Sequence, residues 1–373
     1  MNQKKIAFLL PGRDTSPCGG YKIAYEYANR FSQIGYDVAL VYPHIETFFS
    51  KKNKNIFIQV KKYFGMLIKW KLKKRLKAGE WFSISSQIQK IHIFKISDFF
   101  LRKKLKGYKI IATAVETAYA LNKISFIPDA DKFYFIQDFE QWNGKTAEEI
   151  YESYRFPLKK IVIAPWLQKE VEKTGNTAFL IPNGFDFNYF KLTQSIEKRS
   201  PFEIAMLYHK DDRKRCCDSI DALKIVKTYI PQLHVTMFGT PEKPDLPEWF
   251  SYYQCPDKET HNSIYNNASI FVAASKAEGM ALPPAEAMIC GAALCCTDIG
   301  GFSLYAKNNT TALLSPVYDV KKLADNILLL INNQKLRIEL AENGHNYIQQ
   351  FTWGNAFSLF KNVIEGNTFN DQR

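Results

Sequence analysis

Short apolar runs alternate with amphipathic stretches along most of this chain. Residues 4–12 form an apolar run of strand length, and residues 21–35 carry apolar side chains at helical spacing before a glycine. Residues 36–43 form a second apolar run. A strand, a glycine-containing loop, a helix and a second strand predict a βαβ unit, the building block of a parallel sheet covered by helices.

The same alternation continues through the first half and starts again after residue 186. In the first half we expect further strands at residues 82–94, 108–115, 132–140 and 160–166. In the second half we expect strands at residues 202–208, 233–239, 269–275 and 293–298, and helices at residues 214–230, 261–268 and 283–291. The pattern predicts an α/β fold of two doubly wound halves joined near residues 164–190. Ligands of such sheets bind beyond the carboxyl ends of the strands, so two facing halves would enclose a central cleft.

Length and composition support two packed domains. The chain has 373 residues, which exceeds the size at which a single core usually keeps growing, and 46% of them are hydrophobic. No uninterrupted apolar run reaches eighteen residues, and the first fourteen residues reach proline and charge too early for a secretory signal. We therefore expect a cytoplasmic protein.

The chain has seven cysteines and six histidines, and neither set shows the paired spacing of a metal site. Neighbouring pairs such as Cys216 and Cys217 are most simply reduced core thiols in a cytoplasmic protein. We expect no metal and no cofactor.

The chain is strongly basic, with a formal net charge of +13. This charge indicates a polyanionic partner, which could be nucleic acid, an anionic membrane surface or the phosphate groups of a small substrate. The segment from Lys51 to Lys77 holds eleven basic residues and no acidic one, interleaved with aromatic and aliphatic side chains. This composition is typical of a basic helix in the headgroup layer, and we predict that the segment binds an anionic membrane surface. A solvated charged face is the alternative.

Two glutamates flank a Pro-Pro turn in the stretch KAEGMALPPAEAMICGAAL. The stretch should run from a strand through a loop into a helix, because proline suits a first helical turn. The backbone amides of Met280, Ala281 and Leu282 would then converge at the positive end of that helix and could hold phosphate oxygens. Glu286 lies early enough in the helix to accept hydrogen bonds from a ribose diol, and Glu278 would face what lies beyond the phosphates.

The run EGMALPPAEAMICG resembles the E-x7-E motif of retaining GT-B glycosyltransferases of family 4, where the usual run is EGFGLPPLEAMACG. The likeness extends over SIYNNASIFVAAS, TDIGG, LLSPVYDVKKLADNILLL and FTWGNAFSLF, and IPNGFDFNYF resembles the family's interdomain element. The resemblance implies a GT-B fold, with two Rossmann-like doubly wound domains facing a central cleft. It places an acceptor-binding domain at residues 1–180, a nucleotide-sugar donor domain at residues 181–352, and a C-terminal helix at residues 353–373 that packs back on the first domain.

The resemblance also implies roles for individual residues. In the family the second glutamate binds the nucleotide ribose and the first lies at the donor sugar, which gives these roles to Glu286 and Glu278. An arginine and a lysine five residues later contact the diphosphate there. Lys214 matches the lysine, whereas His209 stands in the place of the arginine. Three neighbouring cations could compensate for this change: Lys210, Arg213 and Arg215.

The N-terminal half matches the family less closely. Gly19 and Gly20 follow the first strand at the position of the family's glycine loop below the donor phosphates, although a simple turn has the same composition. The family often places a histidine on the N-domain side of the cleft, where this chain has Thr113 and Glu116. Two carboxylates past the FYFIQ strand are expected either at the mouth of the cleft or as structural caps: Asp138 and Glu140.

The resemblance implies a glycosyltransferase that moves a sugar from a nucleotide-diphosphate donor to a growing glycan, with retention and without a metal. IIATAVETAYALN and FYFIQDFEQWN are similar to rhamnosyltransferases of bacterial surface-polysaccharide assembly, so the sugar would be rhamnose and the acceptor a glycan or a lipid-linked glycan at the inner face of the membrane. Catalysis should rest on preorganised hydrogen-bond donors to the leaving phosphate. The candidate residues are Lys214, Glu278 and Glu116 for catalysis, Gly19, Gly20, His209, Lys214, Glu278, Met280, Ala281, Leu282 and Glu286 for the donor, and Thr113, Asp138 and Glu140 for the acceptor.

Two other functions compete with this interpretation. A nucleotide-sugar 2-epimerase also uses two such halves, and it would change the donor without any acceptor. A nucleic-acid-binding protein would use the basic aromatic segment to stack bases. The second alternative leaves the two glutamates and their glycine- and proline-rich surroundings unexplained, so we expect no nucleic-acid partner.

Overall fold

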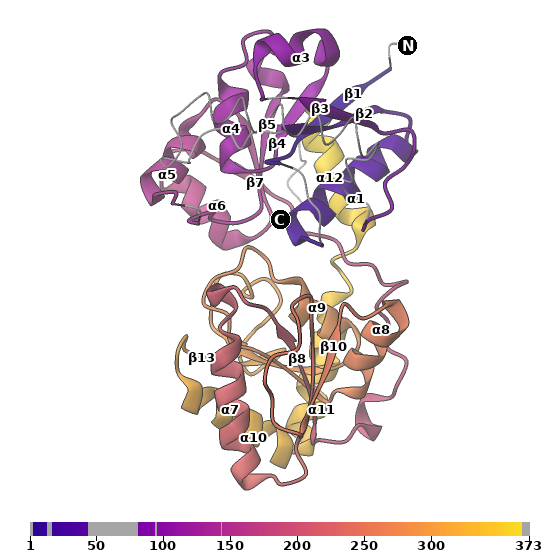
Figure 1. The fold of residues 1–373 in the computed structure, drawn as a ribbon, viewed down its shortest axis with the longest axis vertical. Helices are drawn as coiled ribbons and strands as arrows, with labels where there is room; N and C mark the ends of the chain where they lie inside the picture. Colours follow the sequence, from indigo (N-terminus) through magenta and orange to yellow (C-terminus); the bar gives the residue numbers. More distant parts are fainter. Residues whose placement is uncertain (1–2, 13–16, 44–80, 94, 143, 368–373) are drawn as a thin grey trace. The chain divides into compact units, whose positions relative to one another are not determined.

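The computed structural model describes residues 3–12, 17–43, 81–93, 95–142 and 144–367. The basic segment from Lys51 to Lys77 lies outside the described residues. The chain forms two compact units (Figure 1). The first comprises Met1–Ile163, Leu167–Ile181 and Phe357–Arg373, and the second comprises Ala164–Trp166 and Pro182–Ala356.

The first unit is built on a seven-stranded parallel sheet with the strand order β3-β2-β1-β4-β5-β6-β7. Its strands are β1 (Lys5–Leu9), β2 (Asp37–Pro43), β3 (Gln89–Ile93), β4 (Lys109–Ala112), β5 (Lys132–Ile136), β6 (Lys159–Val162) and β7 (Ala178–Leu180). Its helices are α1 (Gly19–Gln33), α3 (Asp98–Leu105), α4 (Val115–Asn122), η1 (Asp129–Asp131), α5 (Ala147–Arg155) and most of α6 (Pro165–Glu172) and α12 (Trp353–Glu365). The order reverses between β1 and β4.

The second unit holds a six-stranded parallel sheet with the strand order β10-β9-β8-β11-β12-β13. Its strands are β8 (Glu203–Tyr208), β9 (His234–Gly239), β10 (Phe250–Gln254), β11 (Ile270–Ala273), β12 (Ala293–Thr297) and β13 (Ala312–Ser315). Its helices are η2 (Ile196–Lys198), η3 (Asp212–Lys214), α7 (Cys216–Tyr229), α8 (Lys258–Asn267), α9 (Leu282–Ile289), α10 (Val320–Asn332) and α11 (Gln334–Ile348). Here the order reverses between β8 and β11.

The predicted α/β fold of two doubly wound sheets is confirmed. Residues 6–9 of β1 are completely buried, because helices cover both faces of a parallel sheet, and this burial explains the continuous apolar run at the start of the chain. Of the four edge strands, β3 was predicted, whereas β7, β10 and β13 were not. Each of these three has a strand neighbour on one side only and is at most five residues long, so its hydrophobic signal is weak.

The strand predicted at residues 82–94 is shorter than expected, since only β3 forms. A side chain of α1 explains the difference. Asn29 Nδ2 donates a 2.8 Å hydrogen bond to the Ser83 carbonyl, and the Ser85 N–H donates to Asn29 Oδ1 at 2.9 Å. These backbone groups bind a side chain, so they do not join the ladder of the sheet.

The last turns of α12 complete the core of the first unit. Phe360 is fully buried, and its ring stacks on Tyr27 with the centroids 4.1 Å apart. The edge of the same ring meets Phe135 at 5.3 Å. At the end of the helix, Glu365 accepts a hydrogen bond of 2.6 Å from the Tyr36 hydroxyl. Residues from the two ends of the chain therefore share one hydrophobic core.

Replacing Phe360 by Ala should lower the free energy of unfolding of the first unit by about 3 to 5 kcal/mol, because the substitution leaves a cavity beside the rings of Tyr27 and Phe135. Urea unfolding followed by tryptophan fluorescence and circular dichroism measures this change. Ile34→Ala is the matched control, since Ile34 is 48% exposed in the same unit. A loss for Phe360→Ala no larger than that of the control would contradict the packing of α12.

Candidate functional site

The strand order reverses at one place in each sheet, and ligands of open α/β sheets bind at the carboxyl ends of the two strands that flank the reversal. In the second sheet these strands are β8 and β11, which end at Tyr208 and Ala273. The loop after β8 carries Lys214, and the loop after β11 carries Glu278. The topology therefore brings together two residues that are 64 positions apart in the sequence.

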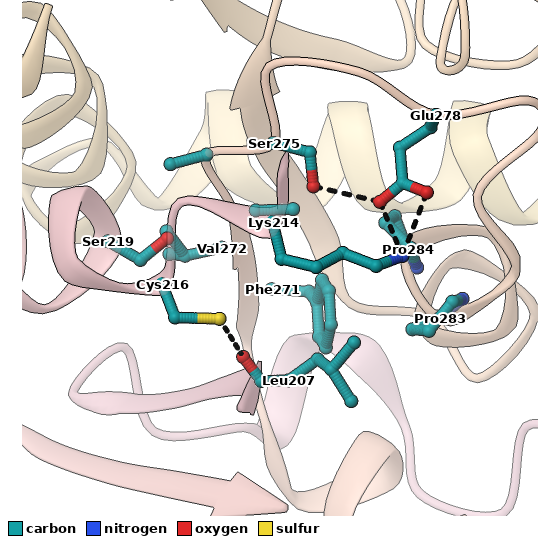
Figure 2. A pocket seen from close by; sticks show the side chains of 12 residues that line it. Leu207, Lys214, Cys216, Ser219, Phe271, Val272, Ser275, Glu278, Pro283 and Pro284 are labelled. Carbon is teal, nitrogen blue, oxygen red and sulfur yellow. Dashed lines mark hydrogen bonds and ion pairs between the residues drawn. The ribbon is translucent and has the colours of Figure 1, made fainter. Parts of the chain in front are cut away.

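Lys214 and Glu278 form an ion pair in a small pocket at this edge (Figure 2). The Lys214 Nζ atom lies 2.6 Å from Oε1 and 2.8 Å from Oε2 of Glu278, and the Ser275 hydroxyl donates to Oε1 at 2.9 Å. The side chains of Lys214 and Glu278 are 22% and 12% exposed, so the pair is partly desolvated yet reachable by a ligand. The other lining residues are Leu207, Cys216, Ser219, Phe271, Val272, Ala273, Ala274, Pro283 and Pro284.

Close packing fixes the backbone around Glu278. A Cβ atom at Gly301 would lie 2.3 Å from the Cβ of Glu278, so only glycine fits there. The Trp166 indole donates a hydrogen bond of 2.8 Å to the carbonyl of Gly279. The sequence did not reveal the roles of Ser275, Trp166 and Gly301. The family resemblance covered Ser275, at the end of SIYNNASIFVAAS, and Gly301, in TDIGG, but it gave neither residue a role.

Glu286 lies in the second turn of α9 and is buried, with 6% of its surface exposed. The hydroxyl of Tyr265, on α8, donates to Glu286 Oε2 at 3.2 Å. Burial raises the pKa of Tyr265 well above its usual value, so this phenol remains a hydrogen-bond donor. The contact orients one oxygen of the Glu286 carboxylate. The first turn of α9 lines the pocket with Pro283 and Pro284.

The loop amides do not all have the expected role. We expected the backbone N–H groups of Met280, Ala281 and Leu282 to be available for phosphate, but the Ala281 N–H donates to the carbonyl of Gly301 at 3.2 Å. The carbonyl of Ala281 accepts a hydrogen bond of 2.6 Å from the Tyr305 hydroxyl. The expectation is therefore wrong for Ala281. The reason is that the turn at Gly301 packs closely against the loop that carries Glu278 and Ala281. The sequence pattern does not specify this contact.

His209 follows β8 at the place of the family's arginine. The Asp211 N–H donates to His209 Nδ1 at 2.9 Å, so this ring nitrogen carries no proton. Partial desolvation, reinforced by the nearby Lys214 ammonium, lowers the pKa of His209 from its usual value. A neutral imidazole with its N–H at Nε2 therefore stands where the family has a fixed positive charge.

The three cations that could compensate for this change differ in their surroundings. Arg213 pairs with Asp211 at 2.7 Å, and Arg215 pairs with two aspartates, each at 2.7 Å. In the part of the chain that the structure describes, Lys210 is exposed and forms no ion pair. The two arginines are thus partly neutralised by aspartates. Of these cations and Lys214, only Lys214 lines the pocket.

In the first sheet the reversal lies between β1 and β4. Gly19 and Gly20, which follow β1, form the first turn of α1, and Cys18 is its N-cap residue. Gln137, which follows β5, donates to the carbonyl of Gly20 at 3.2 Å. The two glycines therefore begin a helix, whose first N–H groups lie at this edge of the first sheet.

A buried charged cluster lies at the start of α4, at the same edge. The Lys145 Nζ atom lies 2.5 Å from Glu116 Oε1 and 3.6 Å from Glu140 Oε2, and the Lys145 side chain is 1% exposed. The Val115 N–H donates to Glu140 Oε2 at 3.2 Å, so Glu140 caps the helix. Burial, together with the charge of Glu116, raises the pKa of Glu140 to about 8. The structural alternative that we left open for Glu140 is therefore supported.

The other acceptor-side candidates also contact the backbone. The hydroxyl of Thr113, which is buried, donates to the Leu9 carbonyl at 2.8 Å and ties β4 to β1. This bond contradicts the expectation that Thr113 is available to an acceptor. Asp138 Oδ1 accepts the Phe139 N–H at 2.8 Å, but its side chain is partly exposed. Asp138 and Glu116, whose side chain is 20% exposed, are the carboxylates that a ligand can reach.

Among the described residues, no three His, Cys, Asp or Glu side chains gather in an arrangement that could hold a metal ion. None of the helices that these residues form is long and apolar enough to cross a bilayer. All seven cysteines are free thiols. Cys216 is buried but Cys217 is exposed, so only the first of this pair is a core thiol.

The fold and the pocket define an α/β protein with a candidate ligand site at the reversal of its second sheet. The stretch that contains this pocket matches a family of enzymes. Residues 193–347 match the family Glycosyl transferases group 1. An uncharacterised glycosyltransferase of Methanocaldococcus jannaschii is 30% identical over 103 residues, which make up 28% of this chain and 29% of that protein. The match therefore spans less than a third of the length of this relative.

Two solved structures are similar over nearly the whole chain. A variant of TarM from S. aureus, in complex with fondaparinux, alpha-GlcNAc-glycerol and UDP, has a TM-score of 0.70 and 13% identity, with 97% of this chain and 100% of that chain covered. Sucrose-phosphate synthase from Thermosynechococcus elongatus has a TM-score of 0.70 and 15% identity, with coverages of 98% and 99%. The chain thus has the GT-B fold, as predicted.

Replacing Glu140 by Gln should make the stability of the protein less sensitive to pH. Because its pKa of about 8 in the folded protein exceeds the usual 4.5, Glu140 contributes stability that is complete below the unfolded pKa and is lost as the pH rises through about 8. Glutamine never ionises and still accepts the Val115 N–H. The variant should therefore gain roughly 2 to 4 kcal/mol relative to the wild type between about pH 5 and pH 8.

Urea unfolding at several pH values in this range measures the difference. Glu342→Gln, at an exposed carboxylate of α11, is the matched control and should follow the wild type. Parallel pH dependence of Glu140→Gln and the wild type would show that Glu140 is ionised in the folded protein.

Proposed function

We propose that the protein is a glycosyltransferase that takes its sugar from a nucleotide-diphosphate donor bound at the reversal of the second sheet. The observation that carries this proposal is the Lys214–Glu278 pair, a cation and a carboxylate in one pocket within the group 1 glycosyl transferase domain. A TarM structure with the same fold contains UDP, which supports a nucleotide diphosphate as the ligand class. The family match favours this function over the epimerase.

The pair suggests how the pocket would act on a donor. The diphosphate is the leaving group, so negative charge grows on its oxygen in the transition state, and a preorganised ammonium stabilises that charge. We infer that Lys214 exchanges part of its contact with Glu278 for the phosphates. Glu278, still held by the Ser275 hydroxyl, would then face the donor sugar, while Glu286 accepts hydrogen bonds from the ribose hydroxyls. The N–H of His209 offers one further uncharged donor.

We assign the acceptor to the corresponding edge of the first sheet, where Glu116 and Asp138 are partly exposed. The buried ammonium of Lys145 pairs with Glu116 and keeps this carboxylate in place for hydroxyl groups of a sugar. We propose retention of configuration, with the leaving phosphate taking the acceptor proton, so that no nucleophile from the protein is required. The rhamnosyltransferase-like segments suggest rhamnose as the sugar and a bacterial surface glycan as the acceptor.

We also propose that the enzyme works at the inner face of the cell membrane. The composition of the segment from Lys51 to Lys77 supports this location, since eleven cations without an acidic residue favour an anionic lipid surface. A surface location would bring the donor site close to a lipid-linked acceptor.

The experiment that tests this function is a thermal-shift screen with UDP, GDP, dTDP and their sugars, followed by transfer assays with the donor that stabilises the protein. A ligand at a hundred times its dissociation constant stabilises by about 2.7 kcal/mol, which gives a clear shift. We expect one nucleoside diphosphate and its sugar to stabilise the protein. A protein that responds to none of them would contradict the proposal.

Two substitutions should change nucleotide affinity in opposite directions. Glu278→Gln removes the carboxylate that competes with phosphate for Lys214, so the stabilising nucleoside diphosphate should bind roughly fivefold more tightly. Glu286→Gln keeps the bond from Tyr265 but removes the charged acceptor for the ribose, so affinity should fall by roughly 1 to 3 kcal/mol.

Isothermal calorimetry measures both changes, and each variant is the shape-matched control of the other. Equal changes in both would point to a general effect of charge and would contradict the separate roles of the two glutamates.

A further inference from the structure

Helix α3 presents a face on which an exposed aromatic ring is followed only by cations. Phe99, Arg102 and Lys103 are spaced at i, i+3 and i+4, the spacing of one helical face, and Lys106 is the C-cap residue that follows the helix. All four are exposed. Phe99 is 86% exposed, more than any other large hydrophobic residue that the structure describes. Figure 1 shows α3 at the surface of the first unit.

The opposite face of α3 attaches the helix to the first unit. Leu101 and Leu105 are completely buried. Asp98, the only acidic residue of the helix, accepts the Ser125 N–H at 3.1 Å and is also bonded by the Ser125 hydroxyl. Its carboxylate lies 3.9 Å from the guanidinium of Arg102, whose side chain is nevertheless 64% exposed. The fold therefore needs Leu101, Leu105 and Asp98. The Phe99 ring meets the neighbouring Phe100 ring edge to face at 5.1 Å between centroids, and most of its surface remains exposed.

The charge around Phe99 indicates what covers it. Between Lys95 and Lys106 the chain has five basic residues and one acidic residue, a net charge of +4. Soluble surfaces usually mix both signs, and an exposed aromatic ring is costly in water but favourable in the interfacial layer of a bilayer. An aromatic residue flanked by cations on one helical face is the pattern of a helix that lies on an anionic membrane.

We propose that α3 is a membrane-contact element, in which Phe99 enters the interfacial layer of an anionic bilayer and Arg102, Lys103 and Lys106 bind lipid phosphates. This inference rests on the membrane association proposed above and adds to it an element with described side chains. It does not depend on the identity of the donor, because α3 belongs to the first unit and the donor pocket to the second.

The test is co-sedimentation of the full chain with vesicles made of equal parts phosphatidylcholine and phosphatidylglycerol, compared with pure phosphatidylcholine. Phe99→Ser should weaken binding about tenfold. Phe179→Ser, which removes a 40% exposed ring from the edge strand β7, is its matched control and should bind like the wild type.

The charges are tested in the same way. The triple variant R102Q/K103Q/K106Q should bind the anionic vesicles roughly a hundredfold more weakly, since each basic residue near an anionic surface contributes roughly a fivefold effect. The triple variant K321Q/K322Q/K335Q removes the same charge from exposed positions of α10 and α11 and should lose much less. All variants should keep the thermal stability of the wild type.

The outcomes separate this proposal from the ones on which it builds. Unchanged binding of both α3 variants would overturn the role of α3, and substitution of Lys69, Lys71, Lys73, Lys74 and Arg75 by Gln would then show whether the basic segment alone binds. Equal losses for the two triple variants would also overturn it, as would equal binding to neutral vesicles or displacement of the vesicles by a single-stranded oligonucleotide. Absence of vesicle binding by the wild type would exclude both membrane contacts and leave the nucleotide-binding tests unaffected.

Discussion

The ion pair between Lys214 and Glu278 is the interaction on which the proposed chemistry depends. A partly buried pair adds little net stability, because desolvation offsets most of the Coulomb attraction. The pair instead places the Lys214 ammonium in a partly desolvated pocket, where the Glu278 carboxylate balances its charge until a ligand binds. The hydroxyl of Ser275 and the close fit against Gly301 hold the glutamate in place. A polyanionic ligand can then replace Glu278 as the partner of the ammonium at a small cost in free energy, since Glu278 keeps its hydrogen bond from Ser275.

The strand order reverses once in each sheet, but the charged residues at the two reversals have different surroundings. At the reversal of the second sheet, the accessible charges are one lysine and one glutamate in a small pocket. At the reversal of the first sheet, a fully covered lysine lies between two glutamates, and the pKa of the more buried one, Glu140, is raised. A site for a diphosphate needs an available cation, whereas a site for neutral sugar hydroxyls needs carboxylates that stay in place. The proposed division of donor and acceptor between the units rests on this difference.

Much of the fold could be predicted from sequence, because hydrophobic periodicity records burial directly. The central strands, buried on both faces, gave the strongest signals, and the short edge strands β7, β10 and β13 gave almost none. Residues 82–88 looked like part of a strand, but the backbone groups of Ser83 and Ser85 hydrogen-bond to the Asn29 side chain, more than fifty positions away. A one-dimensional pattern does not contain such contacts.

The candidate site was predictable to a different degree. The family resemblance singled out Lys214, Glu278 and Glu286, and the topology brings the first two into contact. The supporting residues Ser275, Trp166 and Gly301 were missed, since their roles depend on distances between loops. The same cause explains the wrong expectations for the Ala281 amide and for Thr113, whose hydrogen-bonding groups already bind backbone carbonyls. Sequence identifies which chemical groups are present, and the tertiary structure decides which of them remain available.

The central claim is that a nucleotide diphosphate binds at the reversal of the second sheet. The most direct measurement is a crystal structure of the protein with UDP, or with whichever nucleoside diphosphate stabilises it best. The account predicts that a phosphate oxygen lies within hydrogen-bonding distance of Lys214 Nζ, that the ribose hydroxyls contact Glu286, and that Glu278 is separated from at least part of the lysine contact. Nucleotide bound at another place, with the Lys214–Glu278 pair intact, would contradict the account.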